Sequence, residues 1–91
     1  MKFGVVIPNV GTLASNETLM EISHTSEQLG FDGIFVNDHV IVPADLTSRY
    51  PYRSNGVFPI SHTDNIFDPI VTLSYLAATT RTIKLGFSVL I

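Results

Sequence analysis

Three short apolar runs that alternate with two helical patterns constrain the fold of this chain more than any other feature. The apolar runs cover residues 3–7, 34–36 and 83–91, and the helical patterns lie between them, over residues 15–30 and 68–81. Strands that alternate with helices pair in parallel, and the crossover connections are right-handed in nearly all cases. If the strands lie side by side in chain order, both helices must cover the same face of the sheet.

Local signals predict where the two helices begin and end. Ser15 is a good N-cap for the first helix, and Gly30 suits the position just after its end, where a positive φ is wanted. Asp68 followed by Pro69 is an N-cap with proline at the first helical position. Helical spacing then predicts one shared face of the second helix for Ile70, Leu73, Leu76, Ala77 and Thr80.

The predicted strands are apolar on both faces, so the face without helices also needs a cover. More helices on a doubly wound sheet or the packed interior of a barrel would supply it. The glycines form no G-x-G-x-x-G after the first strand, which disfavours a dinucleotide-binding doubly wound sheet. We therefore predict the α/β class, with residues 1–91 as one domain that forms the N-terminal βαβαβ part of a (β/α)8 TIM barrel with parallel strands. A complete barrel uses roughly 250 residues, so we expect only the first three strands and two helices, cut short before closure.

Charge and composition exclude several classes of function. The net charge is −3 and no run of Lys or Arg is present, so we expect no nucleic-acid partner. The absence of cysteine excludes disulfides and a thiolate zinc site. The apolar run near the N-terminus is too short for a signal peptide or a membrane span, so we expect a cytoplasmic protein without a membrane partner. Because 45% of the residues are hydrophobic, some apolar surface will stay exposed in so small a chain. A homo-oligomer that covers this surface is one of the alternatives.

Polar residues follow each predicted strand, and ligands of parallel α/β proteins bind beyond these carboxyl ends. Asn9 follows the first strand and is our candidate for contact with a small-molecule substrate. Asp38 and His39 follow the second strand, where a carboxylate and an imidazole offer a hydrogen-bonding group and a proton-transfer group that titrates near neutrality. Ser88 is the candidate on the third strand. The alternative is that Asp38 caps a turn and His39 packs under the following loop.

A long segment without sustained periodicity, residues 40–67, follows the second strand. Connections of this length inside compact domains are usually lids or binding loops. Its aromatic residues could cover an apolar substrate or anchor the loop by burying their rings: Tyr50, Tyr52 and Phe58. His62 and Asp64 could join Asp38 and His39 as metal ligands, but no pair has the fixed spacing of dedicated metal sites, so we predict no metal.

Several sequence blocks together resemble the luciferase-like monooxygenase family. Residues 2–9 read KFGVVIPN, residues 27–39 read EQLGFDGIFVNDH and residues 85–90 read LGFSVL, with a Pro-Tyr loop and an Asp-Pro helix start between them. The resemblance extends over the whole chain and is more specific than any single block. One departure is Asn37, where many relatives have Ser.

The resemblance implies a (β/α)8 barrel that carries reduced FMN or coenzyme F420 at the carboxyl rim, and hence an oxidoreductase of the monooxygenase or dehydrogenase type. It implies cofactor contacts for Asp38, His39, Ser88 and Val89, with His39 as the catalytic group that handles a proton or orients the substrate. It also implies a non-prolyl cis peptide at Ser88–Val89. The proline-rich block over residues 42–59 resembles the F420 branch more than the light-emitting branch. Two other hypotheses stay open: a non-catalytic fragment or interaction module, and a metal-dependent barrel hydrolase or isomerase.

Overall fold

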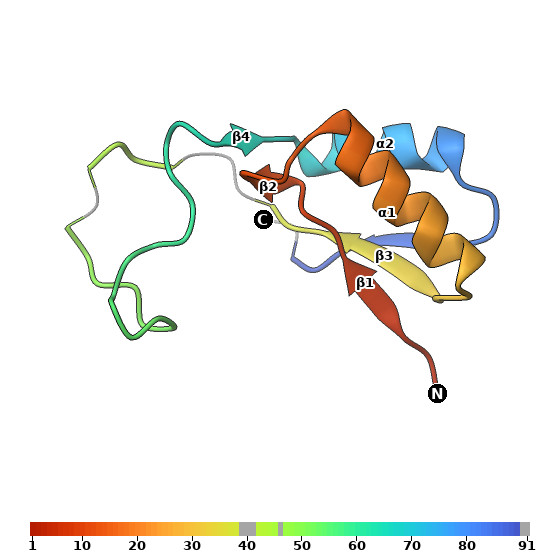
Figure 1. Cartoon of the computed structure of the whole chain (residues 1–91), viewed down its shortest axis with the longest axis horizontal. Helices are drawn as coiled ribbons and strands as arrows, with labels where there is room; N and C mark the ends of the chain where they lie inside the picture. Colours follow the sequence, from red (N-terminus) through yellow and green to blue (C-terminus); the bar gives the residue numbers. More distant parts are fainter. Residues whose placement is uncertain (39–41, 46, 90–91) are drawn as a thin grey trace.

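The computed structural model describes residues 1–38, 42–45 and 47–89 and has a three-stranded sheet with two helices packed on it (Figure 1). The elements follow in the order β1 (Gly4–Val6), β2 (Val10–Gly11), α1 (Asn16–Gln28), β3 (Gly33–Val36), β4 (Asn65–Ile66), α2 (Pro69–Thr79) and β5 (Lys84–Phe87). The predicted α/β class and the order of the three main strands and two helices are confirmed.

The main sheet is parallel, with β3 in the centre and the strand order β1-β3-β5. Ile34 on β3 lies opposite Val5 on one side and Leu85 on the other. Both helices lie over the same face of this sheet, as two right-handed crossovers between adjacent strands require (Figure 1). The described strands thus form an open βαβαβ unit.

The core lies between the sheet and the two helices. Buried side chains from the first strand exit, both helices, β3 and the residue before β5 meet there, namely Ile7, Leu19, Ile34, Val36, Leu76 and Ile83. Side chains alternate along a strand, so Ile34 and Val36 face the helices while Phe35 between them points to the other face. The hydrophobic core therefore uses only one of the two faces of the sheet.

Phe35 occupies the sheet face that no described helix covers. Its neighbours in register are Val6, which is 57% exposed, and Gly86. A Cβ added at Gly4 or Gly86 would come within 3 Å of the Phe35 ring, and one added at Gly33 would lie 3.0 Å from it. The ring therefore lies flat across β1, β3 and β5. It fits there because the three glycines have no side chain that would occupy its place. This face has the apolar character predicted for it.

The predicted helix ends are confirmed. Ser15 Oγ accepts a hydrogen bond from the Thr18 amide at the start of α1. The helix ends in a Schellman motif, in which the amides of Gly30 and Phe31 donate to the carbonyls of Glu27 and Ser26. Gly30 has a φ of 84°, a conformation that residues with a Cβ rarely adopt.

The second helix begins as predicted but buries a different face. Asp68 Oδ1 accepts from the Val71 amide, and Pro69 is the first helical residue. Leu76 is buried, whereas Ile70 is 57% exposed. Thr72 is buried instead, and its hydroxyl donates to the Asp68 carbonyl, so a polar residue can occupy the interior face at little cost. Ile70 was predicted to share one helix face with Leu76, and its exposure shows that it does not lie on the buried face with it.

The long connection contains a short strand that the sequence did not reveal. β4 pairs with β2 in an antiparallel sheet of two strands, with Val10 opposite Ile66. The described residues 47–64 of the connection extend away from the sheet and helices (Figure 1). For this reason the radius of gyration is 14.3 Å, above the value of about 12 Å expected for a compact chain of this length.

A single carboxylate links α1 to the turn before β5. Glu27 Oε2 accepts hydrogen bonds from the backbone amides of Arg81, Thr82 and Ile83 at 2.9, 2.7 and 2.9 Å. These three donors, with Ile83 contributing most, lower the pKa of Glu27 from 4.5 to about 2. The ionised carboxylate is therefore favoured in the folded state, and it holds the end of α1 to the entry of β5.

We expect Glu27→Gln to lower the melting temperature at pH 7, because a neutral amide is a weaker acceptor for three donors. A lowered folded-state pKa contributes stability that is complete above the usual pKa of 4.5 and is lost as the pH falls towards about 2. The difference between variant and wild type should therefore shrink across this window in thermal unfolding monitored by circular dichroism. The exposed Glu21 of the same helix supplies the control Glu21→Gln, and an equal loss in both variants would contradict the assignment.

Candidate functional site

The exits of β3 and β5 are joined at the carboxyl rim of the sheet. The Ser88 amide donates to the Val36 carbonyl at 2.9 Å, which continues the parallel ladder beyond β5. The Ser88 hydroxyl donates to Asn37 Oδ1. Asn37 and Ser88 thus lie side by side, as expected for residues that follow neighbouring parallel strands.

Asn9 holds the exit of β1 to the same rim. Its side-chain amide donates to the carbonyls of Asn37 (2.8 Å) and Phe67 (3.1 Å), and its Oδ1 accepts from the Asn37 amide (3.0 Å). The residue is completely buried. Asn9 was expected to contact the substrate, but both amide protons already bind backbone. In the structure Asn9 positions the strand exits, and its contact with a substrate stays a prediction.

A cavity of about 350 Å³ opens above these strand exits. The lining residues come from β2, from both strand exits and from the long connection: Val10, Asn37, Asp38, Tyr50, Phe58, Pro59, Ile60, Ser88 and Val89. Three residues predicted for the site, Asp38, Ser88 and Val89, therefore meet around one cavity. This volume lies within the range of small-molecule sites, and the lining combines apolar walls with a few polar groups.

Two expectations for the rim concern His39 and the peptide bond between Ser88 and Val89. His39, the predicted catalytic residue, lies outside the described residues. The peptide bond between Ser88 and Val89 is not cis, since the described part of the chain has no cis peptide bonds. The non-prolyl cis peptide implied there by the family resemblance is therefore not found.

Several residues that line the cavity were not predicted from the sequence. Val10 enters it because β2 pairs with β4, and a strand of two residues leaves no periodic signal. Pro59 and Ile60 belong to the irregular part of the long connection, where no pattern predicts the direction of a side chain. The aromatic residues Tyr50 and Phe58 were candidates, and both line the cavity.

His62 and Asp64 do not join Asp38. They line a neighbouring cavity of about 480 Å³, which shares only Phe58, Pro59 and Ile60 with the first. Asp64 Oδ2 accepts from the Ser61 amide in a local turn. Within the described ranges no cluster of three or more His, Cys, Asp or Glu side chains could hold a metal ion.

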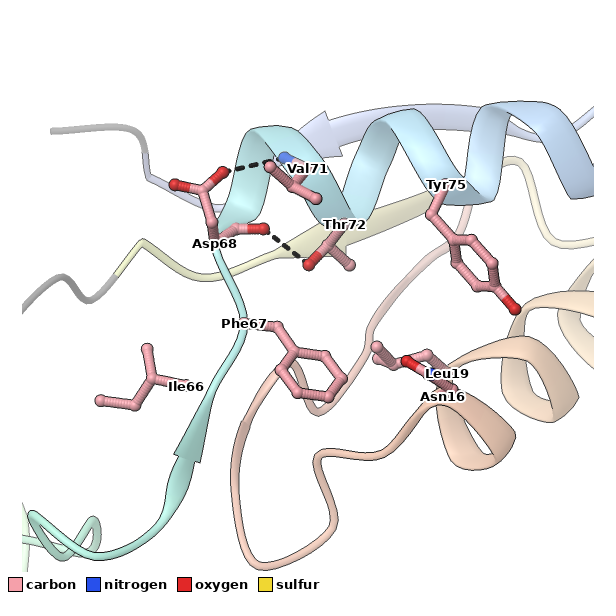
Figure 2. A pocket seen from close by; sticks show the side chains of 8 residues that line it. All are labelled: Asn16, Leu19, Ile66, Phe67, Asp68, Val71, Thr72 and Tyr75. Carbon is pink, nitrogen blue, oxygen red and sulfur yellow. Dashed lines mark hydrogen bonds between the residues drawn. The ribbon is translucent and has the colours of Figure 1, made fainter.

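A further cavity of about 410 Å³ lies between the first turns of α1 and α2 (Figure 2). Leu19, Phe67, Val71 and Tyr75 give it a mainly apolar lining. Two of its polar members, Asp68 and Thr72, are engaged in the hydrogen bonds that start α2, drawn as dashed lines in Figure 2, and Asn16 is a further polar member. The position between helix starts and the engaged polar groups make this cavity a weaker candidate than the one at the strand exits.

The cavity at the strand exits can hold a ligand between two unlike walls. Asn37, Asp38 and Ser88 offer hydrogen-bonding groups along the rim, and Tyr50 and Phe58 offer aromatic surface from the long connection. Such an arrangement orients a flat or apolar group by its polar edge. None of the helices in the part of the chain that the structure describes is long and apolar enough to cross a membrane.

The structure is a parallel βαβαβ unit of the α/β class, with a cavity at the carboxyl ends of its strands, where ligands of such proteins usually bind. The model of the luciferase-like monooxygenase family matches residues 1–91, and the chain belongs to this family. The resemblance seen in the sequence blocks is thereby confirmed. Searches of curated proteins and of solved structures gave no significant match.

We expect Asn9→Ala to destabilise the fold by about 3 kcal/mol, because buried backbone groups of Asn37 and Phe67 would lose their partners. Urea denaturation measures the change. Asn55→Ala is the control: Asn55 is exposed and accepts only a local hydrogen bond from the Val57 amide, so the loss should stay below about 1 kcal/mol. A similar small loss for Asn9→Ala would show that its buried amide does not organise the rim.

Proposed function

We propose that this chain carries the rim site of an F420- or FMN-dependent oxidoreductase that acts on a small-molecule substrate. Membership of the luciferase-like monooxygenase family supports the oxidoreductase class. The observation that carries the proposal is the convergence of Asp38, Ser88 and Val89 on one cavity at the ends of β3 and β5. These residues are the ones for which the family resemblance implies cofactor contacts.

The described residues suit the ring end of such a cofactor. Its polar edge would meet Asp38, Asn37 and Ser88, while Val10 and Val89 would pack against its apolar surface. When bound, the flavin or deazaflavin ring supplies hydride or oxygen chemistry, and the protein supplies binding, orientation and exclusion of water. Among the described residues that line this cavity no Lys or Arg occurs, which favours the ring end of the cofactor over its phosphate end as the occupant.

His39 is the proposed proton-handling group. It follows Asp38 directly in the sequence, and an imidazole titrates close to neutral pH. A group of this kind can pass a proton to or from a substrate when the cofactor ring exchanges a hydride. F420 is the leading cofactor because residues 42–59 resemble the F420 branch, and FMN is the alternative.

We expect the chain to bind F420 or FMN saturably, and we expect Asp38→Asn and Ser88→Ala each to weaken that binding about three- to tenfold, the value of one hydrogen bond. Both cofactors are fluorescent, so titration of each with purified chain gives the dissociation constant directly. Asp45→Asn is the matched control, because it removes one negative charge from an exposed loop position outside the cavity. Its affinity should equal that of the wild type.

Two outcomes would contradict the proposal. If neither cofactor binds saturably to the folded chain, a non-catalytic interaction module becomes the better description. If a cofactor binds with equal affinity to the wild type, Asp38→Asn and Ser88→Ala, then it binds at a place other than the strand exits.

A further inference from the structure

Tyr50, which lines the rim cavity, belongs to a short closed loop within the long connection. The Tyr50 amide donates to the Gly56 carbonyl at 2.8 Å, and the Gly56 amide donates to the Arg53 carbonyl at 3.0 Å. The Arg49 guanidinium donates to the Ser54 carbonyl across the same loop. These bonds close residues 49–56 into a unit that fixes the start of the chain segment leading to Phe58.

Gly56 makes this closure possible. Its φ is 69°, in the left-handed region. A Cβ at this position would approach Arg49 Cγ to 2.5 Å. Any larger residue would strain the backbone and push the Arg49 side chain away. The loop geometry therefore places Tyr50 and Phe58 beside each other.

Three aromatic rings lie together on this loop and the segment that follows it, and two of the three line the cavity. Tyr50 and Phe58 have ring centroids 5.2 Å apart and ring planes at 78°. Tyr52 packs on Tyr50 at 5.5 Å and 72°, yet it is 84% exposed and does not line the cavity. The sequence left two roles open for these rings, a cover over a substrate or an anchor for the loop. Tyr50 and Phe58 pack on each other and also line the cavity.

Two rings that stand almost perpendicular form a corner of aromatic surface. Aromatic rings prefer offset-stacked or edge-to-face contacts. A flat ring in the corner can stack on one of the two side chains while its edge meets the face of the other. A saturated ring of the same size is thicker and has no quadrupole, so it gains only the burial of its apolar surface.

We propose that Tyr50 and Phe58 select a flat aromatic ring as the substrate of this site. The role of this substrate ring in a reaction rests on the proposed function: the cofactor ring would lie along the polar groups of Asn37, Asp38 and Ser88, and the substrate ring would lie against Tyr50 and Phe58, which line the same cavity. Tyr50 and Phe58 are thus specificity-determining residues for an aromatic or fused-ring substrate. The ring-binding part of the proposal can be tested without the cofactor.

The test is a titration of the isotope-labelled chain with naphthol, in which nuclear magnetic resonance records the chemical shifts of the backbone amides. We expect saturable shifts at Asn37 and Ser88, which line the same cavity as Tyr50 and Phe58. Decahydronaphthol has the same carbon skeleton without aromatic character, and it should bind at least about fivefold more weakly. Tyr50→Ala and Phe58→Ala should each weaken naphthol binding about tenfold.

Two variants separate ring contact from loss of structure. Tyr52→Ala removes an aromatic residue from the same cluster without touching the cavity, so its affinity for naphthol should stay at the wild-type value. Tyr50→Phe keeps the ring and should also bind as wild type. The proposal is overturned if naphthol does not bind saturably, if both alcohols bind equally well, or if Tyr52→Ala weakens binding as much as Tyr50→Ala.

The same variants distinguish failure of this proposal from failure of the proposed function. Titration with F420 or FMN reports on the proposed function, and titration with naphthol in the absence of cofactor reports on the ring site alone. If naphthol binds as expected and no cofactor does, the aromatic corner is a binding site without the proposed redox role. If a cofactor binds and the corner variants leave naphthol unaffected, the proposed function stands and the assignment of a ring substrate falls.

Discussion

The side-chain amide of Asn9 holds together three parts of the chain that lie far apart in the sequence. It binds both backbone groups of Asn37, 28 residues away, and the carbonyl of Phe67, 58 residues away. The rim cavity depends on these contacts, because Asn37 lines it and Phe67 leads into α2. A buried amide with all its protons engaged is costly to disturb. The position of the strand exits is therefore set from inside the fold, beneath the surface that meets a ligand.

Features governed by neighbouring residues could be predicted from the sequence. Ser15, Gly30, Asp68 and Pro69 mark helix ends through bonds within a few residues, and all four act as expected. The parallel order of the strands followed from chain connectivity and handedness. The convergence of Asp38 with Ser88 followed from the same topology, since parallel strands end at one edge. These two rim residues could be predicted without any knowledge of side-chain packing.

Features governed by distant contacts could not be predicted. The pairing of β2 with β4 joins residues that are more than fifty positions apart, and two residues per strand carry no periodic signal. Thr72 lies on the buried face of α2 and Ile70 does not. The Thr72 hydroxyl donates to the Asp68 carbonyl one turn earlier, and a prediction from hydrophobic spacing takes no account of such a hydrogen bond. Asn9 was placed correctly at the rim, but its burial depended on carbonyls contributed by two other segments.

Phe35 extends this dependence to the open face of the sheet. One ring fills the space above glycines on three different strands, so the volumes of four residues form a single shared quantity. A larger residue at Gly4 or Gly86 would bring its Cβ against the Phe35 ring, so the ring would have to move or position 35 would have to become smaller. The open face therefore couples β1, β3 and β5 through one side chain: a substitution on either outer strand changes the space that is left for the central strand.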